Sequence, residues 1–279
     1  MYMNDSVDRS EIREHVVNQL IALGLPCQRN LKNESLMKRI CGDALTKRRT
    51  KMEFKVKDGG KERLVRVYGK VFGVSPRKLD TEDVMLKTGQ VLPVPMLVHD
   101  LCEFLLENVE TEGIFRKAGS TSRQANIKSK IDGKKELPVT LIPNTHFKLL
   151  MACYHYDNKE ELIFLAVLLL PIEHLNLLTY LMHFFKEVSA SSATNKMTPY
   201  NLSVCIAPNI FPVVQFSAEE FSKVTDITKM LIERAAEIGK IPDKLVKEMC
   251  VQKGNSKKKT TFGSRFMHNV MKGFDFMTC

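Results

Sequence analysis

"VPMLVHDLCEFLLENVETEGIFRKAGS", residues 94–120, decides the fold class of this chain. Its first half repeats apolar residues at the three- and four-residue spacing of an amphipathic helix. The members of this stripe are Leu97, Leu101, Phe104, Leu105 and Val109. Glycines at positions 113 and 119 then interrupt the helical pattern, and a further helix is predicted directly after them. The stretch therefore predicts a helix, a tight loop and a second helix.

The helical pattern continues to about residue 250. The apolar run at 162–170 is too short to span a bilayer, and we interpret it as a buried helix closed by Pro171. A further amphipathic helix is expected at 174–188. The central domain is therefore predicted to be all-α.

Local signals predict where three more helices begin. Capping-box patterns occur at Thr121 with Gln124 and at Ser217 with Glu220. Thr198 followed by Pro199 is an N-cap with a first-turn proline, and Pro208 is expected to end that helix.

The flanks differ in composition from this domain. Residues 28–70 hold 14 Lys or Arg against 5 Asp or Glu, and the tail after residue 251 is also basic, whereas the middle is close to neutral. An amphipathic helix is predicted near the N-terminus, ending at Gly24, and residues 64–74 have a β-like pattern. The expected organisation is an N-terminal helix at 1–24, a basic linker at 25–68, the helical domain at 69–250 and a basic tail at 251–279.

The sequence shows no self-contained catalytic machinery. It has no P-loop, no paired-glycine dinucleotide motif and no G-x-S-x-G elbow. The seven histidines never occur at i and i+4, and the seven cysteines form no CxxC pair, so we predict no metal site and no cofactor. Cys153 and His155 are close in sequence but would face different sides of a helix. The chain is not expected to be an enzyme.

The loop after the first predicted helix contains residues that are expected to fix its backbone. Gly113 permits an unusual backbone turn, and Ile114 and Phe115 are expected to be buried beneath it. Arg116 is then held outward on a rigid base. An exposed arginine is usually only a solvated charge, but a preorganised guanidinium can complete the active site of another protein.

Two ordered motifs carry a resemblance to a known family. "EGIFRKAGS", 112–120, resembles the arginine-finger loop of Rho GTPase-activating (RhoGAP) domains, and "NKMTPYNLSVCIAPNIF", 195–211, resembles the signature of that family. "GKVFGV", 69–74, matches the start of the domain and is most similar to its nuclear, cell-cycle-linked branch. The resemblance implies a helical bundle that docks on a Rho-family small GTPase in its GTP-bound state.

The resemblance also implies roles for individual residues. Arg116 corresponds to the catalytic finger, and Lys117 beside it adds positive charge. Asn201 matches the motif asparagine that steadies the finger loop and the GTPase switch region, although an amide capping buried backbone is the alternative. Asn209 and Lys135 are further candidates for contacting the GTPase.

The match has a gap near residues 132–136. The family normally has a further helix before its E-L-P sequence, whereas "KIDGKKELPVTLIP", 130–143, reaches that sequence directly. Lys135 occupies the place of the last arginine of this helix, and the lysine four residues earlier is replaced by Ile131. Loss of a core helix exposes apolar surface, so stability and GTPase activation are both expected to be impaired.

Two functions from different classes remain open at this point. The first is a GTPase-activating protein acting in trans, and the second is a non-catalytic module that binds Rho-type GTPases or other proteins. The basic tail is either solvated or a helix for a membrane surface, and the sparse aromatics of the basic arm do not favour nucleic-acid binding. The polar N-terminus and the basic clusters at 47–51 and 257–259 predict an intracellular protein of the nucleus or cytoplasm.

Overall fold

The computed structural model describes residues 2–3, 9–27, 51–58, 61–68, 71, 74–132, 141–212 and 215–247. The chain divides into two compact units, Met1–Lys240 and Ile241–Cys279. Of the second unit, residues 241–247 are described, and 243–247 are helical. The predicted tail at 251–279 lies outside the described residues.

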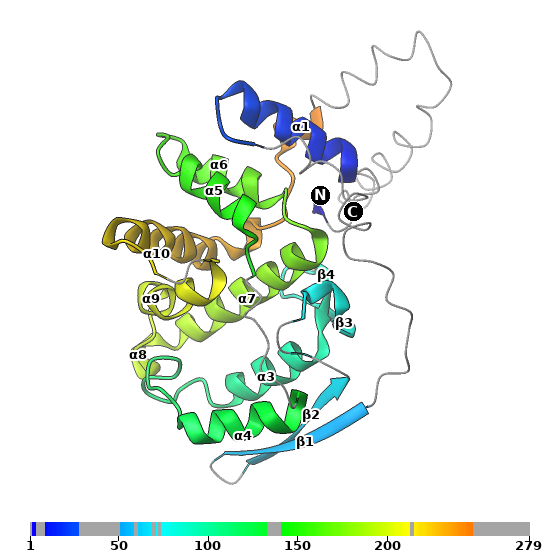
Figure 1. The fold of residues 1–279 in the computed structure, drawn as a ribbon, viewed down its shortest axis with the longest axis vertical. Coiled ribbons are helices and arrows are strands. Elements are labelled where there is room, and N and C mark those ends of the chain that lie inside the picture. Colours follow the sequence, from blue (N-terminus) through cyan, green and yellow to red (C-terminus); the bar gives the residue numbers. More distant parts are fainter. Residues whose placement is uncertain are drawn as a thin grey trace, which may run out of the picture. The chain divides into compact units, whose positions relative to one another are not determined.

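The first unit is predominantly helical, as predicted (Figure 1). Its elements in chain order are α1 (Arg9–Ala22), β1 (Lys51–Asp58), β2 (Lys61–Tyr68), η3 (Pro76–Lys78), β3 (Thr81–Met85), β4 (Val91–Pro95), α3 (Met96–Glu107), α4 (Thr121–Asp132), α5 (Asn144–Cys153), α6 (Lys159–Val167), α7 (Ile172–Ala190), α8 (Ser192–Asn195), α9 (Pro199–Ile210), α10 (Ala218–Glu233) and η4 (Ala235–Glu237). Among the described residues, none of the helices combines the length and apolarity needed to cross a bilayer.

Helix α7 is the centre of the bundle. It packs against β4, α9, α10 and η4, and Figure 1 shows these elements on several sides of it. Its buried residues include polar as well as apolar side chains and lie all around the helix, which is the pattern of a helix enclosed by its neighbours. The apolar run at 162–170 precedes α7 and is almost entirely buried, as predicted, although its helix ends at Val167.

Helix starts agree with the sequence more closely than helix ends. Ser217 and Glu220 form both hydrogen bonds of the capping box, at 3.1 and 3.0 Å. Thr198 caps α9 by accepting from the Asn201 backbone N–H. The expectation that Pro208 ends α9 was wrong, since the helix runs on to Ile210. Pro208 has no N–H to donate to the Val204 carbonyl, and the helix nevertheless continues for two more residues.

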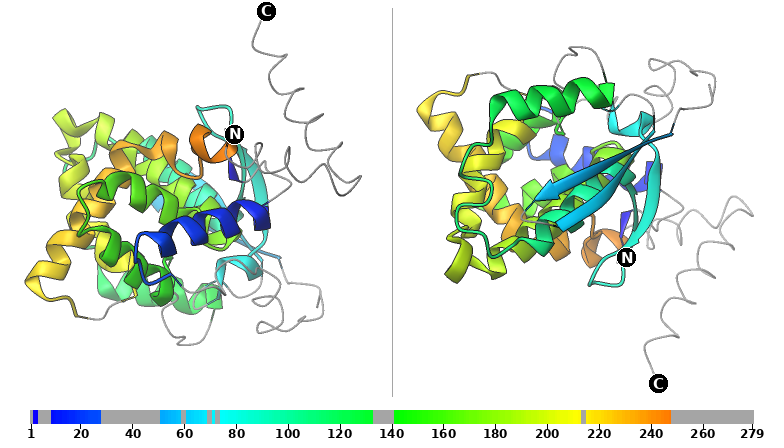
Figure 2. Two further views of the ribbon diagram at one scale, coloured as in Figure 1. Left: turned by 90° about the horizontal axis from the view of Figure 1, so that it is seen from above. Right: turned by 90° about the horizontal axis from the view of Figure 1, so that it is seen from below.

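Two antiparallel hairpins are present, of which the sequence predicted only the β-like pattern at 64–74, which overlaps β2. Strands β1 and β2 pair from Lys51↔Tyr68 to Asp58↔Lys61, so the second half of the expected linker at 25–68 is a hairpin. Strand β2 packs against α3, and Figure 2 shows this hairpin from a second direction. Strands β3 and β4 form a separate hairpin in which Met85 pairs with Val91. The basic composition of the first hairpin resembles that of a loop, which explains the error.

Helix α1 is part of the domain, although the sequence placed residues 1–24 outside it. The unit Met1–Lys240 includes this helix, and α1 packs against α6. The Arg13 guanidinium donates a hydrogen bond to the Leu170 carbonyl, and the Tyr156 hydroxyl donates to the Leu23 carbonyl at 2.8 Å. The buried face of α1 consists of Ile12, Arg13, Val16, Val17 and Leu20.

Adjacent residues of α1 allow a matched test of this packing. Leu20 is fully buried, whereas Ile21 is 37% exposed. We expect Leu20→Ala to lower the free energy of unfolding by about 2 to 5 kcal/mol because it leaves a cavity, and Ile21→Ala to lower it by less than about 1 kcal/mol. Urea denaturation of both variants measures the difference. Equal, small effects would show that α1 does not contribute to the core.

Candidate functional site

The loop between α3 and α4 makes a tight backbone turn at Gly113. The φ of Gly113 is +78°, a left-handed conformation that favours glycine. Its carbonyl accepts hydrogen bonds from the backbone N–H groups of Arg116 and Lys117, both at 2.9 Å. A Cβ added at Gly113 would lie 3.0 Å from side-chain carbons of Lys117. The left-handed conformation therefore favours glycine, and a Cβ there would displace the exposed Lys117 side chain.

Phe115 also has a left-handed backbone, with φ of +67°. This conformation costs on the order of 1 to 3 kcal/mol for a residue other than glycine. Its ring makes edge contacts with Phe184 and Phe185 of α7, with centroid distances of 6.0 and 5.5 Å. Such contacts stabilise the strained residue beyond their buried area. Ile114 and Phe115 are half-buried, so the apolar base predicted beneath the loop is present.

Arg116 follows directly and is exposed. In the part of the chain that the structure describes, its guanidinium forms neither a hydrogen bond nor an ion pair. Lys117 is also exposed. The loop therefore holds its backbone firmly and leaves a guanidinium and an ammonium group in solvent.

A buried asparagine, Asn195 of α8, fastens the loop to the bundle. Its backbone carbonyl accepts from the Gly113 N–H at 3.0 Å. Its side-chain amide donates to the Val109 and Val188 carbonyls at 2.8 and 2.9 Å, and its Oδ1 accepts from the Met197 N–H at 2.7 Å. Asn195 thus joins the end of α3, the end of α7 and the loop before α9.

Sequence reasoning did not select Asn195, although it is the first residue of the quoted motif 195–211. An asparagine in a polar stretch is usually assigned to a turn or a cap, and its partner Val109 lies 86 residues away. The available signal was the position of Asn195 at the head of the motif. Only the structure shows that Asn195 is buried and that its amide groups are all hydrogen-bonded.

The predicted Asn201 lies close to this network. Its side-chain amide donates to the Lys196 carbonyl at 2.8 Å, and Lys196 has a left-handed φ of +62°. Asn201 therefore holds the backbone turn that precedes α9, which is the capping alternative from the sequence. The structure brings Arg116, Lys117 and Asn201 into one region through Asn195.

The other two predicted residues lie elsewhere. Asn209 is exposed near the end of α9, and its amide donates to the Cys205 carbonyl at 3.1 Å. Lys135 lies outside the described residues, as does most of the segment that contains the gap. Asn209 shares α9 with Asn201 but takes no part in the hydrogen bonds around Asn195.

Helix α4, which follows the loop, is poorly covered. The Ser120 hydroxyl accepts from the Arg123 N–H at 3.4 Å, so the N-cap lies one residue before the predicted Thr121. The side chains from Thr121 to Asn126 are all exposed, and so is Ser129.

The chain re-enters the core just before α5. The Ile142 N–H donates to the Ile210 carbonyl at 3.0 Å, and the His174 Nδ1–H donates to the Leu141 carbonyl at 2.7 Å. Burial lowers the pKa of His174, so its ring is neutral at physiological pH and its Nδ1 proton serves this bond. The bundle after the gap is therefore anchored at Leu141 and Ile142.

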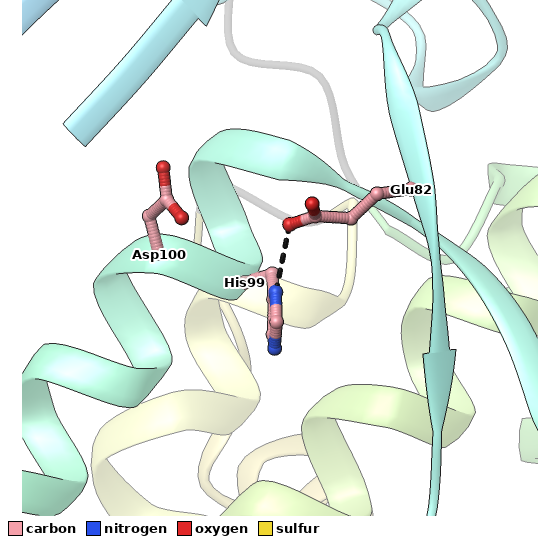
Figure 3. Close-up of side chains that lie close together, drawn as sticks. All are labelled: Glu82, His99 and Asp100. Atoms are coloured by element: carbon pink, nitrogen blue, oxygen red, sulfur yellow. Dashed lines mark hydrogen bonds and ion pairs between the residues drawn. The ribbon is translucent and has the colours of Figure 1, made fainter.

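Glu82, His99 and Asp100 form a second cluster of polar groups (Figure 3). The Glu82 carboxylate of β3 meets His99 Nδ1 of α3 at 2.7 Å, and an Asp100 carboxylate oxygen lies within 4.8 Å of both groups. We interpret the cluster as a contact that joins β3 to α3.

The Cys153 thiol is unsuited to nucleophilic catalysis, because burial raises its pKa to about 12.

Comparison with known proteins identifies the central part of the chain. The family model of the RhoGAP domain matches residues 135–215. Residues 135–215 belong to a RhoGAP domain. The matched residues include Asn195, Asn201 and Asn209, whereas the loop with Arg116 precedes them.

Several relatives are named as Rho GTPase-activating proteins. The chain is 28% identical over 211 residues to human Rho GTPase-activating protein 11A, covering 65% of this chain and 20% of the relative. It is 30% identical over 178 residues to Rho GTPase-activating protein 7 of Bos taurus, covering 54% of this chain and 15% of the relative. The chain therefore spans a fifth or less of the length of these relatives.

A solved structure also aligns with the chain. The crystal structure of human Rho GTPase activating protein 15 aligns with a TM-score of 0.47 and 15% sequence identity, covering 52% of this chain and 83% of that one.

Removing the Asn195 side chain should loosen the backbone segment whose carbonyl holds the Gly113 N–H. Asn195→Ala leaves the Val109 carbonyl and the Met197 N–H without the partner that Asn195 supplies, and it removes one of the two donors to the Val188 carbonyl. We expect the free energy of unfolding to fall by about 2 to 4 kcal/mol, and amide hydrogen exchange at 113–117 to accelerate.

Asn209→Ala is the matched control, because its amide is exposed and bonds only within α9. It should change stability by less than about 0.5 kcal/mol. Unchanged exchange at 113–117 in Asn195→Ala would contradict the anchoring role.

Proposed function

We propose that this chain is a GTPase-activating protein for Rho-family small GTPases and that it inserts Arg116 into the active site of a GTP-bound partner. The observation that carries the proposal is the exposed guanidinium of Arg116 on a loop fixed by Gly113, Phe115 and Asn195. The RhoGAP match at 135–215 and the relatives named as Rho GTPase-activating proteins support the choice of partner.

The chemistry requires only a positioned positive charge. Negative charge develops on the phosphate oxygens during GTP hydrolysis, and an arginine supplied in trans accelerates the reaction by about 10³ to 10⁵. The turn at Gly113 and the packing of Phe115 set the direction of Arg116 before the partner binds, so little ordering entropy is lost at that moment. In this proposal the chain regulates an enzyme and performs no hydrolysis itself.

Other residues contribute to the contact with the GTPase. Lys117 adds positive charge beside the finger, and Asn201 holds the turn before α9 against the same region. Asn209 extends the contact along α9, and Lys135 is a further candidate from the sequence. These assignments follow the family resemblance residue by residue.

The exposed helix α4 favours a second candidate function. A chain that lacks the neighbouring helix can retain a GTPase-binding surface while the finger is aimed poorly, which is a non-catalytic Rho-binding module. The exposed side chains from Thr121 to Asn126 are the observation behind this alternative. Under the main proposal, we expect stimulation weaker than that of a domain with the full segment.

The cellular setting belongs to the same proposal. Rho-type partners and the two basic clusters favour an intracellular location in the nucleus or the cytoplasm. The basic tail can bind an anionic membrane surface through charge attraction. Neither a cofactor nor a specific nucleic acid is required.

Substitution of the finger tests the catalytic claim. In single-turnover GTP hydrolysis with a Rho-type GTPase, Arg116→Ala should abolish stimulation and leave binding to the GTP-analogue complex largely intact. Arg116→Lys should fail nearly as completely, because an ammonium group cannot replace the planar guanidinium fork. Arg123→Ala, which removes an exposed arginine on α4, should preserve stimulation.

The outcomes separate the two candidate functions. An Arg116→Ala variant that keeps most of the stimulation would refute the finger. A wild-type chain that binds the GTPase without stimulating hydrolysis would establish the non-catalytic module.

A further inference from the structure

Tyr200 is an exposed aromatic side chain that the fold does not explain. It is the second residue of α9, and 54% of its surface is exposed. Its backbone carbonyl accepts from the Ser203 hydroxyl, whereas its own hydroxyl has no partner in the part of the chain that the structure describes. A single exposed apolar residue is ordinary on a protein surface, so the location of Tyr200 decides its meaning.

The position of Tyr200 is tied to the finger loop. Asn195 accepts from the Gly113 N–H, and Asn201, directly after Tyr200, donates to the Lys196 carbonyl. Figure 1 shows the loop between α3 and α4 beside α8 and the start of α9. Other large apolar side chains exposed in the described residues are Ile21, Leu23, Met85, Val91 and Leu101. They lie on α1, on the turn after it, on the β3–β4 hairpin and on α3. The hydrogen bonds of Asn195 connect none of these positions to the loop that carries Arg116.

Tyr200 also begins an accessible stripe of α9. Positions four residues apart lie on the same side of a helix, and two such rows are present, 200, 204 and 208 and the adjacent 201, 205 and 209. All six residues are at least partly exposed. The buried side of the helix is formed by Leu202, Ser203, Ala207 and Ile210. The stripe therefore extends from the finger loop along α9 to Asn209.

We propose that Tyr200 is an apolar anchor for the GTP-bound Rho-type GTPase, packing its ring against the partner's surface beside the nucleotide site. This inference rests on the proposed function. Tyrosine and arginine are the side chains most enriched among residues that dominate binding energy at protein interfaces. Tyrosine offers a large contact area with only two side-chain torsions to fix, so little entropy is lost on binding.

The anchor acts on affinity and leaves the chemical step unchanged. The Tyr200 ring has no charge that could respond to charge developing on the transferred phosphoryl group. Its contact contributes equally to the ground state and the transition state, which raises affinity without raising the saturated rate. For Arg116→Ala we expect the opposite result, in which the stimulated rate is lost and the affinity is largely retained.

Affinity and saturated rate distinguish these roles. We expect Tyr200→Ala to weaken binding to a Rho-type GTPase loaded with a non-hydrolysable GTP analogue by about tenfold. The saturated single-turnover rate should stay within about twofold of wild type. Tyr200→Phe should retain most of the affinity, because the ring makes the contact. Met85→Ala, which removes a side chain that is 73% exposed on the β3–β4 hairpin, is the matched control and should bind as wild type.

Each outcome decides the inference. Wild-type affinity in Tyr200→Ala would overturn it and leave the proposed function intact, as would a loss confined to the saturated rate. An equal loss of affinity in Met85→Ala would also overturn it, because the effect would not be local. A wild-type chain that does not bind the loaded GTPase would overturn the proposed function and the anchor together. Thermal unfolding verifies that the exposed substitutions leave the fold unchanged.

Discussion

The site depends on the hydrogen bonds of one buried residue, Asn195. Its backbone carbonyl fixes the turn at Gly113, while its amide ties the end of α3 to the end of α7. Asn195 is fully buried and each of its amide groups is paired, so loss of a partner is costly. The loop that carries Arg116 is therefore fastened to the core of the bundle. This arrangement allows a firm loop beside an exposed helix.

The strained backbone of Phe115 has the same origin. A left-handed phenylalanine persists only where its surroundings determine its conformation, and the rings of Phe184 and Phe185 supply that restraint. Both rings belong to α7, the most enclosed helix. The backbone that leads to Arg116 is thus held by packing against α7.

Much of the fold was accessible from the sequence because its signals are local. Helical periodicity and the caps at Ser217 and Thr198 depend on residues a few positions apart. The β1–β2 hairpin was missed because its basic composition resembles that of a linker. The packing of α1 was missed because a short amphipathic pattern does not identify the element against which the helix packs. Arg116 stood out through its motif, whereas the importance of Asn195 depends on partners far along the chain.

In the proposed function Asn195 positions Arg116 for the GTPase, and the saturated rate of stimulated hydrolysis tests this role most directly. Single-turnover GTP hydrolysis by a Rho-type GTPase should be measured with saturating wild-type chain and with saturating Asn195→Ala, at a temperature where both are folded. We predict a rate at least about tenfold lower for Asn195→Ala, with affinity for the GTP-analogue complex within about threefold of wild type. A saturated rate equal to that of wild type would contradict the account.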